Sequence, residues 1–295
     1  MKPIRWLFAI LLVLLMGSSA PAFAGGLTAQ EYTYLLDGRS VAVPVDIVPV
    51  QRTFLVPREL LQTAGVTVTA TGSTAELARG PVTVKLVLRS DTADVDGRTL
   101  LLGAAPMAVG DRLFVPAEVA LELGFEIQVQ GKFVFITDYA AALEKPLSSM
   151  DPDAYARLWK AQTVTSSLRQ ADGASAALQI TLLTPAMLQD TQLQIPWGAR
   201  MKLLALAPAR SLAMVTVANT SGRPVQLDPA SLSLVNDAGQ QADYLNEVLP
   251  LDGSVLALLA PGASRTGVLF YSRLTGPITL YDLRFNMTLG RVAGL

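Results

Sequence analysis

The segment from Leu36 to Gly72 recurs without a gap 59 residues further along the chain, as the step from Asp37 to Asp96 shows. Unrelated segments of this length and composition share about two or three identities, so a longer set in one register indicates duplication. The sequence therefore predicts a structural unit that occurs twice. The identical residues of the first copy include Asp37, Gly38, Arg39, Val56, Pro57, Glu59, Gly65 and Gly72.

The first 24 residues have the features of a secretory signal peptide. Lys2 and Arg5 precede an apolar run from Trp6 to Met16, and Ala22-Phe23-Ala24 has the small-residue form that signal peptidase accepts. The run is shorter than the roughly 20 residues of a membrane-spanning helix. We therefore expect cleavage before Gly25 and a mature protein without a membrane span, located in the envelope outside the cytoplasm of a bacterium.

Composition excludes most catalytic chemistry. The chain has no Cys and no His, so it lacks thiol nucleophiles, imidazole bases and the usual ligands of transition metals. The formal net charge is −1, and no dense run of Lys and Arg suggests a nucleic-acid partner. We expect no enzymatic activity, no cofactor and no metal.

Local patterns predict the same small unit in both copies. Asp37-Gly38 and Asp96-Gly97 are expected to be two-residue turns between strands. A strand, a short helix beginning at a Pro, and a left-handed glycine cap should follow each turn. The prolines are Pro57 and Pro116, and the caps are Gly65 and Gly124. The segment Phe133 to Ile136 has no polar face, which predicts a central strand buried on both sides.

These residues resemble the copper amine oxidase N-terminal domain, the stalk repeat of many secreted bacterial proteins. The resemblance depends on the strand ending Phe54-x-Val56-Pro57, the short helix with its closing glycine, and the Asp96-Gly97 turn before the second copy. We assign residues 25–138 to this unit. Arg58 directly follows the proline, whereas the family usually has an Arg one position later. The resemblance implies a scaffold, because the copper and quinone site of amine oxidases lies in a separate domain.

Residues 139–172 are expected to be a connector between two domains. Asp151-Pro152 predicts the start of a helix that extends through Lys160. Tyr155 and Trp159 are spaced i, i+4 and share one helix face, which favours docking on a domain over ligand binding.

Strand and turn patterns dominate from Thr163 onward. The turns recur at short intervals, as at Asn219 to Gly222 and Asn236 to Gly239, which is typical of an antiparallel β-sandwich. The segment Val215-x-Val217-x-Asn219 and the later Pro261-Gly262 resemble the immunoglobulin-like domains that end many secreted bacterial lipoproteins. We assign residues 173–295 to such a domain. The expected fold class is an α+β duplicated stalk module followed by an all-β immunoglobulin-like sandwich.

Several acidic and aromatic groups have competing interpretations. Asp91, Asp94 and Asp96 faintly resemble a calcium loop, but a hairpin turn is favoured because the remaining ligands are missing. A solvated helix face is favoured for Glu118 and Glu122 over a glycosidase pair, which needs carboxylates across a cleft. Core packing is favoured over sugar stacking for the pair Tyr32 and Tyr34.

The segment from Pro185 to Arg200 is the strongest candidate for partner binding. It is an irregular run that ends in Ile195-Pro196-Trp197-Gly198, and a loop Trp is often an anchor for a partner. Packing under the sandwich is the alternative. The candidate residues are Trp197, Gln192, Gln194 and Arg200.

The sequence therefore predicts a secreted, non-catalytic envelope protein. It is expected to be a binding or spacer module for cell-wall polymer or another exported protein. An accessory or regulatory subunit of an envelope enzyme is a second hypothesis, and a hydrolase that uses only carboxylates and hydroxyls is a third.

Overall fold

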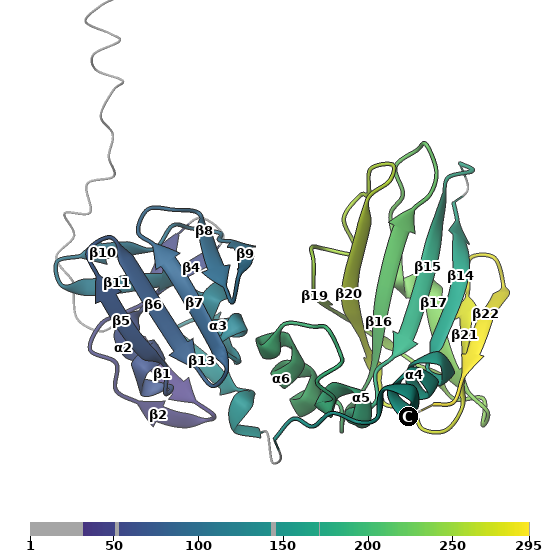
Figure 1. Ribbon diagram of the computed structural model, residues 1–295, viewed down its shortest axis with the longest axis horizontal. Coiled ribbons are helices and arrows are strands. Elements are labelled where there is room, and N and C mark those ends of the chain that lie inside the picture. The colour runs from purple at the N-terminus through teal and green to yellow at the C-terminus, as the bar shows by residue number, and fades with distance from the viewer. Residues whose placement is uncertain (1–31, 51–52, 143–145, 171, 295) are drawn as a thin grey trace, which may run out of the picture.

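The computed structural model describes residues 32–50, 53–142, 146–170 and 172–294. These residues are mostly β-strand and form several sheets with short helices between them. Figure 1 shows two units, an N-terminal unit (residues 32–142) and a C-terminal unit (residues 146–294), with helix α6 (Trp197–Leu206) where they meet. The expected signal peptide lies outside the described residues.

The N-terminal unit contains three sheets, with strand orders β12-β13-β1-β2, β5-β6-β7-β8-β9 and β10-β11-β4-β3. Most of its core lies between the first two sheets and two short helices. Its elements are β1 (Thr33–Leu36), β2 (Arg39–Val41), β3 (Val48–Val50), β4 (Thr53–Pro57), α2 (Arg58–Thr63), β5 (Thr67–Thr71), β6 (Thr74–Arg79), β7 (Val82–Val87), β8 (Thr92–Val95), β9 (Arg98–Leu101), β10 (Met107–Val109), β11 (Arg112–Pro116), α3 (Glu118–Glu122), β12 (Phe125–Gln130), β13 (Phe133–Asp138) and a 3-10 turn (Ala140–Ala142).

Corresponding strands of this unit start 59 residues apart, as β1 at Thr33 and β8 at Thr92 do. At the centre, β4 and β11 pair antiparallel with Val56 directly opposite Val115. The outer sheets each combine strands from both halves of the sequence, because β1 pairs with β13 and β8 pairs with β7 next to β6. Neither half therefore completes its sheets without the other.

The predicted turns are present. Asp37 and Gly38 both have positive φ, 47° and 78°, and join β1 to β2; Asp96 and Gly97 do the same for β8 and β9. This is the geometry of a two-residue hairpin turn whose twist matches that of its strands. The turns therefore fix the register of both hairpins.

The prediction that Pro57 and Pro116 open the helices is wrong by one or two residues. Both prolines end strands instead: Pro57 pairs with Phe114, and Pro116 pairs with Leu55. The helices begin at Arg58 and Glu118. The central strand pair therefore extends through both prolines before either helix can start.

The prediction for Phe133 to Ile136 is half right. Strand β13 is central, between β12 and β1, but only Val134 and Ile136 are buried. Phe133 is 48% exposed on the other face. The outer face of this sheet has no covering layer among the described residues, so its aromatic side chains face solvent.

The C-terminal unit has a five-stranded sheet, β14-β15-β16-β20-β19, and a four-stranded sheet, β18-β17-β21-β22. Side chains from both sheets form one core. Its elements are α4 (Pro152–Ala161), β14 (Thr163–Arg169), β15 (Ser175–Leu182), α5 (Pro185–Gln189), α6 (Trp197–Leu206), β16 (Arg210–Asn219), a 3-10 turn (Pro229–Ser231), β17 (Leu232–Asn236), β18 (Gln241–Ala242), β19 (Tyr244–Pro250), β20 (Ser264–Ser272), β21 (Ile278–Asp282) and β22 (Met287–Val292).

The boundary of this unit corrects the expected connector over residues 139–172. Strand β14 pairs with β15 along its whole length, from Thr163 opposite Thr181 to Arg169 opposite Ser175. Helix α4 begins at Pro152 with the Asp151 side chain accepting from the N–H of Ala154, as the sequence predicts. Because β14 belongs to the sheet, the connection between the units is shorter than expected.

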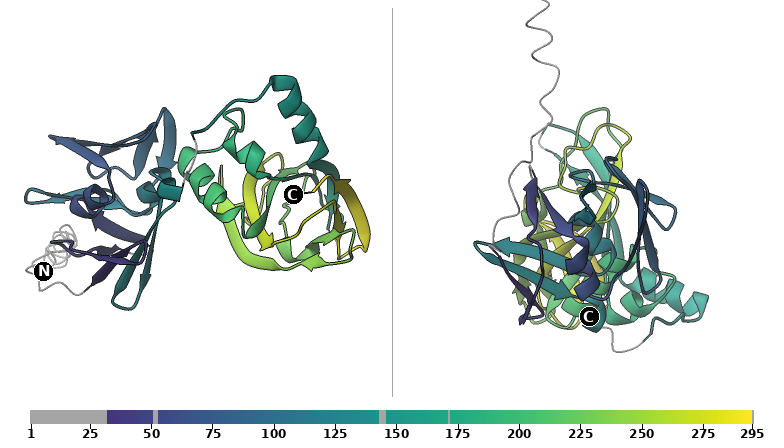
Figure 2. Two further views of the ribbon diagram at one scale, coloured as in Figure 1. Left: turned by 90° about the horizontal axis from the view of Figure 1, so that it is seen from below. Right: turned by 90° about the vertical axis from the view of Figure 1, so that its left-hand side faces the viewer.

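The segment from Pro185 to Arg200 is not an irregular run. It contains α5 and the start of α6, and Figure 2 shows these helices beside the end of the C-terminal sheets that faces the N-terminal unit. Six consecutive residues of α6, from Gly198 to Leu203, are buried. A helix buried around its circumference has no polar face, which explains why periodicity did not reveal it.

Candidate binding groove

The four candidate residues of this segment separate into two groups. Trp197 begins α6, and its ring lies against the backbone of the N-terminal unit. A Cβ built on Gly124 would lie 2.8 Å from this ring, and one built on Gly80 would lie 3.4 Å from it. Trp197 therefore packs between the two units of this chain, as an anchor for α6.

Arg200 also has a structural role. It is 5% exposed, and its guanidinium donates to the backbone carbonyl oxygens of Asp190, at 2.7 Å, and of Leu193. Burial lowers the pKa of this guanidinium from its ordinary value. The side chain holds the loop between α5 and α6 in one conformation.

Asp190 fixes the same loop from its other side. The carboxylate is buried and accepts from the N–H groups of Met150, at 2.7 Å, and Gln192, at 2.8 Å. Gln192 in turn donates through Nε2 to the carbonyl oxygen of Met150, at 2.9 Å. Because these bonds position the loop, Gln192 and Gln194 are held at one edge of a groove.

This aromatic groove is lined by Tyr155, Ala156, Trp159, Gln192, Leu193, Gln194 and Met214, and it has a volume of about 490 Å³. Helix α4 supplies the two rings, whose centroids lie 6.1 Å apart with planes tilted by 30°. No residue of α4, which the structure describes in full, is completely buried. The rings therefore dock partly on the C-terminal unit and also face the groove, where sequence reasoning expected docking alone.

Tyr155 is suited to donate a hydrogen bond in this groove. Burial raises the pKa of its phenol, and the nearby Asp190 carboxylate raises it further. The phenol therefore stays protonated at neutral pH.

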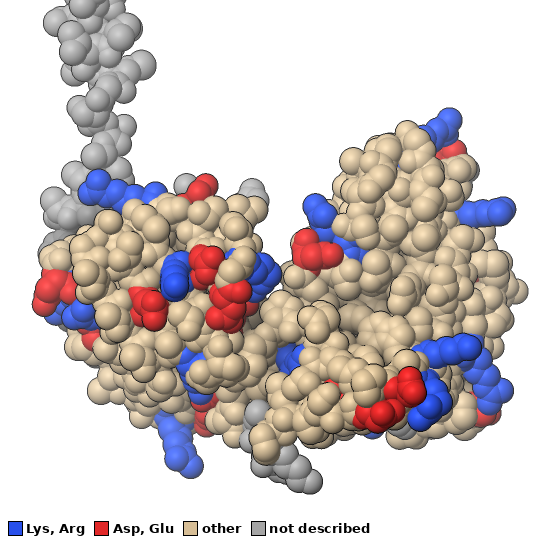
Figure 3. Space-filling model, in the orientation of Figure 1, with Lys and Arg blue, Asp and Glu red and all other residues tan. Residues whose placement is uncertain are grey.

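The sheet next to the groove presents uncharged polar groups. Met214 forms part of the groove, and Thr216 lies two residues further along the same face of β16. Thr216 is opposite Gln179 on one side and Thr266 on the other, with their hydroxyls 3.0 Å apart in the second pair. In Figure 3 the middle of this unit is tan, with charged side chains gathered at its edges. The face therefore suits a neutral, polar ligand.

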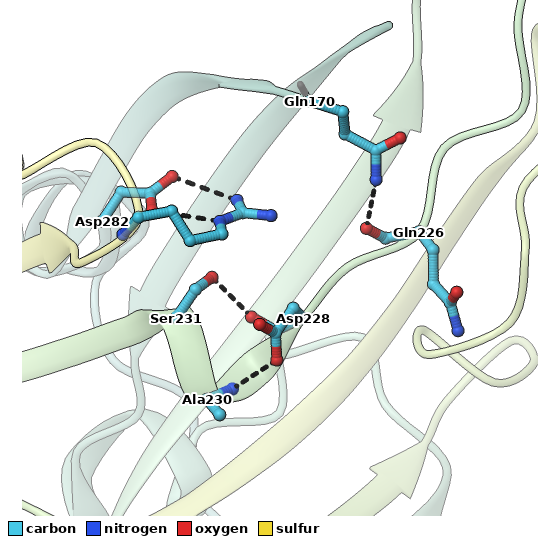
Figure 4. A network of polar contacts seen from close by, with 7 residues as sticks. Gln170, Gln226, Asp228, Ala230, Ser231 and Asp282 are labelled. Carbon is cyan, nitrogen blue, oxygen red and sulfur yellow. Dashed lines mark hydrogen bonds and ion pairs between the residues drawn. The ribbon is translucent and has the colours of Figure 1, made fainter. Parts of the chain in front are cut away.

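A second hollow lies among the loops at the opposite end of the C-terminal unit (Figure 4). It has a volume of about 430 Å³ and is lined partly by Gln170, Gln226, Asp228 and Arg284. Gln170 donates to the carbonyl oxygen of Gln226 at 2.8 Å, Asp228 accepts from the N–H of Ala230 at 3.1 Å, and Arg284 pairs with Asp282 at 3.1 Å. These groups connect the loops to one another.

A third hollow, of about 260 Å³, lies where α6 meets the N-terminal unit, and both Glu118 and Glu126 line it with Lys202. Burial opposes ionisation of Glu126, but the hydrogen bond from Tyr139 and the charge of Lys202 lower its pKa overall. A glycosidase acid needs the opposite shift. Glu122, the other partner considered for Glu118, pairs with Arg98 at 2.6 Å.

The remaining sequence candidates have structural partners. Asp94 accepts from the N–H of Gly97 at 3.1 Å, and Asp96 accepts from that of Thr83 at 2.9 Å, as expected of a hairpin turn. The Tyr34 hydroxyl accepts from the N–H of Ile47 at 2.9 Å inside the core. Within the described ranges, no cluster of three or more acidic side chains is suited to a metal ion. No helix in these ranges is long and apolar enough to cross a membrane.

Residues 35–136 match the family described as the copper amine oxidase N-terminal domain. This confirms the resemblance for the N-terminal unit, whereas the immunoglobulin-like resemblance of the C-terminal unit remains a prediction. No curated protein and no solved structure matches the chain significantly.

Proposed function

We propose that this protein is a secreted, non-catalytic binding module of the bacterial cell envelope, and that its aromatic groove holds a neutral cell-wall polysaccharide. One observation carries the proposal: Tyr155 and Trp159 lie with Gln192 and Gln194 in one groove. The C–H face of a sugar ring stacks on an aromatic ring, while amides and a phenol pair with its hydroxyls. Few precisely placed polar groups on an apolar surface are typical of ligand sites.

The adjoining sheet face extends this chemistry beyond the groove. Gln179, Thr216 and Thr266 offer an amide and two hydroxyls in one row across three strands. A polymer that leaves the groove can continue over this row. The absence of Lys, Arg, Asp and Glu among these groove and row residues favours a neutral ligand over a charged one.

We further infer that the N-terminal unit is a duplicated α+β stalk and that the C-terminal unit is an immunoglobulin-like, all-β sandwich. The 59-residue spacing of equivalent strands supports the first inference, and the two sheets around one core support the second. In this arrangement the stalk spaces the groove from other envelope components. Intact mass of the exported protein tests its location, since the mature chain should begin at Gly25.

Binding of chitohexaose, an uncharged sugar oligomer, tests the groove by isothermal titration calorimetry. W159A should weaken binding about tenfold or more, because it removes a stacking surface. Arg157 lies on the same helix and is exposed outside the groove, so R157A is the matched control. Equal affinities of W159A and R157A would overturn the proposed site.

A protein partner, including an envelope enzyme that this chain would assist, is the second candidate. The loop between β21 and β22 favours it, because Leu283, Phe285 and Met287 are 52%, 47% and 40% exposed. Exposed apolar side chains at a loop tip are typical of a protein contact. A photo-crosslinking residue in place of Phe285 should capture one defined protein in the native envelope, and the same residue in place of the exposed Thr99 should not.

A further inference from the structure

The outer face of the sheet β12-β13-β1-β2 carries an aromatic pair. Phe133 and Phe135 alternate with the buried Val134 and Ile136 along β13, so both rings lie on the solvent side. Their centroids are 6.2 Å apart and their planes are tilted by 34°. Phe133 is 48% exposed, which is unusual for a large aromatic side chain on a central strand.

The neighbours of these rings are uncharged. Gln130 lies opposite Phe133 and Gln128 opposite Phe135 on β12, and both amides are exposed. On the other side, Thr33 and Leu35 are the partners of the same two rings on β1. We define these six residues as the phenylalanine face.

The corresponding face of the other half of the unit provides an internal control. The positions 59 residues before Phe133 and Phe135 are Thr74 and Glu76 on β6, and both are exposed. Glu76 lies opposite Lys85, which lies opposite Asp94, so this face carries a row of alternating charges. Because the same strand arrangement forms with polar side chains there, folding does not require phenylalanine on the outer face.

We infer that the phenylalanine face is a second polysaccharide-binding surface that takes a linear, neutral sugar polymer. Two rings in line along one strand suit successive sugar units, and the flanking Gln and Thr side chains suit their hydroxyls. The lack of charge on all six residues disfavours a charged partner. The ligand class rests on the proposed function, whereas the surface belongs to a different unit from the groove.

The test replaces the phenylalanines with the residues of the other half, as F133T/F135E, and without adding charge, as F133T/F135Q. In calorimetry, wild-type protein should bind about two chitohexaose molecules, whereas either double variant should retain only the groove site. Removal of Phe133 and Phe135 should weaken retention by a long insoluble chitin polymer about tenfold, because simultaneous engagement of two sites is lost. Unchanged thermal midpoints will show that the variants fold.

The two proposals fail in distinguishable ways. If W159A abolishes a site while both phenylalanine variants keep wild-type stoichiometry and retention, the further inference is overturned. If the phenylalanine variants lose a site while W159A matches R157A, the groove proposal fails and the phenylalanine face stands. K85A alters the charged face of the other half and should leave both measurements unchanged; a loss there equal to that of F133T/F135Q would also overturn the inference.

Discussion

The Nζ atom of Lys202 lies 3.1 Å from Oε1 of Glu126, and this ion pair connects α6 to strand β12 of the N-terminal unit. Glu247 of β19 lies 3.2 Å from the same amine and also pairs with Arg210. The Lys202 side chain is only 9% exposed. One buried amine therefore joins carboxylates from both units, which should restrict their relative motion.

Replacement of Lys202 by Met should weaken the connection between the units. It leaves Glu126 and Glu247 without their shared cation, at an expected cost of about 2 kcal/mol, below the value for fully buried pairs because both carboxylates are partly exposed. Urea unfolding of K202M should then show two transitions instead of one. The exposed Lys160 gives the control K160M. A single transition with wild-type stability would contradict the clamp.

Gly65 and Gly124 separate backbone strain from packing against Trp197. Their φ angles are nearly equal, +83° and +82°, but no atom lies within 4 Å of a Cβ built on Gly65. G65A should cost about 1 kcal/mol from the left-handed conformation alone. G124A should cost about 1 to 3 kcal/mol more, because its Cβ also meets the Trp197 ring. Urea denaturation measures both, and equal costs would show that Trp197 yields freely.

Local chemistry explains which parts of the fold could be predicted. The Asp37-Gly38 and Asp96-Gly97 turns and the glycines that end α2 and α3 depend on neighbours in sequence, and all have the expected left-handed backbone. Helix α6 could not be found this way. Its residues contact both units, so the apolar stripe that marks a surface helix is absent.

The candidate groove was only half visible in the sequence. Gln192 and Gln194 were selected for their loop, but the loop becomes a site only beside Tyr155 and Trp159, which are more than 30 residues away in the chain. No spacing rule connects these segments. The exposed Phe133 likewise depends on what covers the sheet, which strand periodicity does not specify.

Arg200 should control the groove without contacting its ligand. R200K keeps the charge but cannot reproduce the paired donation to the carbonyl oxygens of Asp190 and Leu193. We expect a loss of about 2 kcal/mol in stability, since a buried acceptor is left unpaired. Chitohexaose affinity should fall as the loop loosens. Wild-type affinity in folded R200K would contradict the positioning role.

Limited trypsin digestion should cut first between Asp138 and Gly173, now within a narrower region. Arg169 lies in β14, where backbone pairing with β15 should protect it. Arg157 and Lys160 are exposed on α4 and, with Lys145, remain the expected sites. Mass spectrometry of the first fragments identifies the cut. Early cleavage within residues 53–136 would show that the N-terminal unit is not compact.

The pH dependence of stability should be nearly flat between about pH 6 and 8.5, because the chain has no His or Cys to titrate there. EDTA should leave the unfolding midpoint unchanged throughout this range. A steep slope or a loss on chelation would reveal a perturbed carboxylate cluster or a cation site.

Outside the plateau, the two sides should fall for different reasons. The folded-state pKa of Glu126 is below its ordinary value of 4.5, so its contribution is present above that value and is lost as pH falls through the lowered pKa. Burial raises the pKa of Tyr34, Tyr139 and Tyr271 above 10.0, so their contribution is present below pH 10.0 and is lost as pH rises through the raised values.

Thermal unfolding from pH 3 to 11 checks both slopes. E126Q should be less stable at neutral pH and should lose less on acidification, because it has no carboxylate to protonate; E76Q, on an exposed face of β6, is the control. An acid slope identical in E126Q and wild type would assign the loss to other carboxylates. Y139F should flatten the alkaline side in the same way, since the Tyr139 hydroxyl that donates to Glu126 would be absent. If E126Q alone changed the acid side and Y139F alone the alkaline side, the contact between the two units would account for both limits of the plateau.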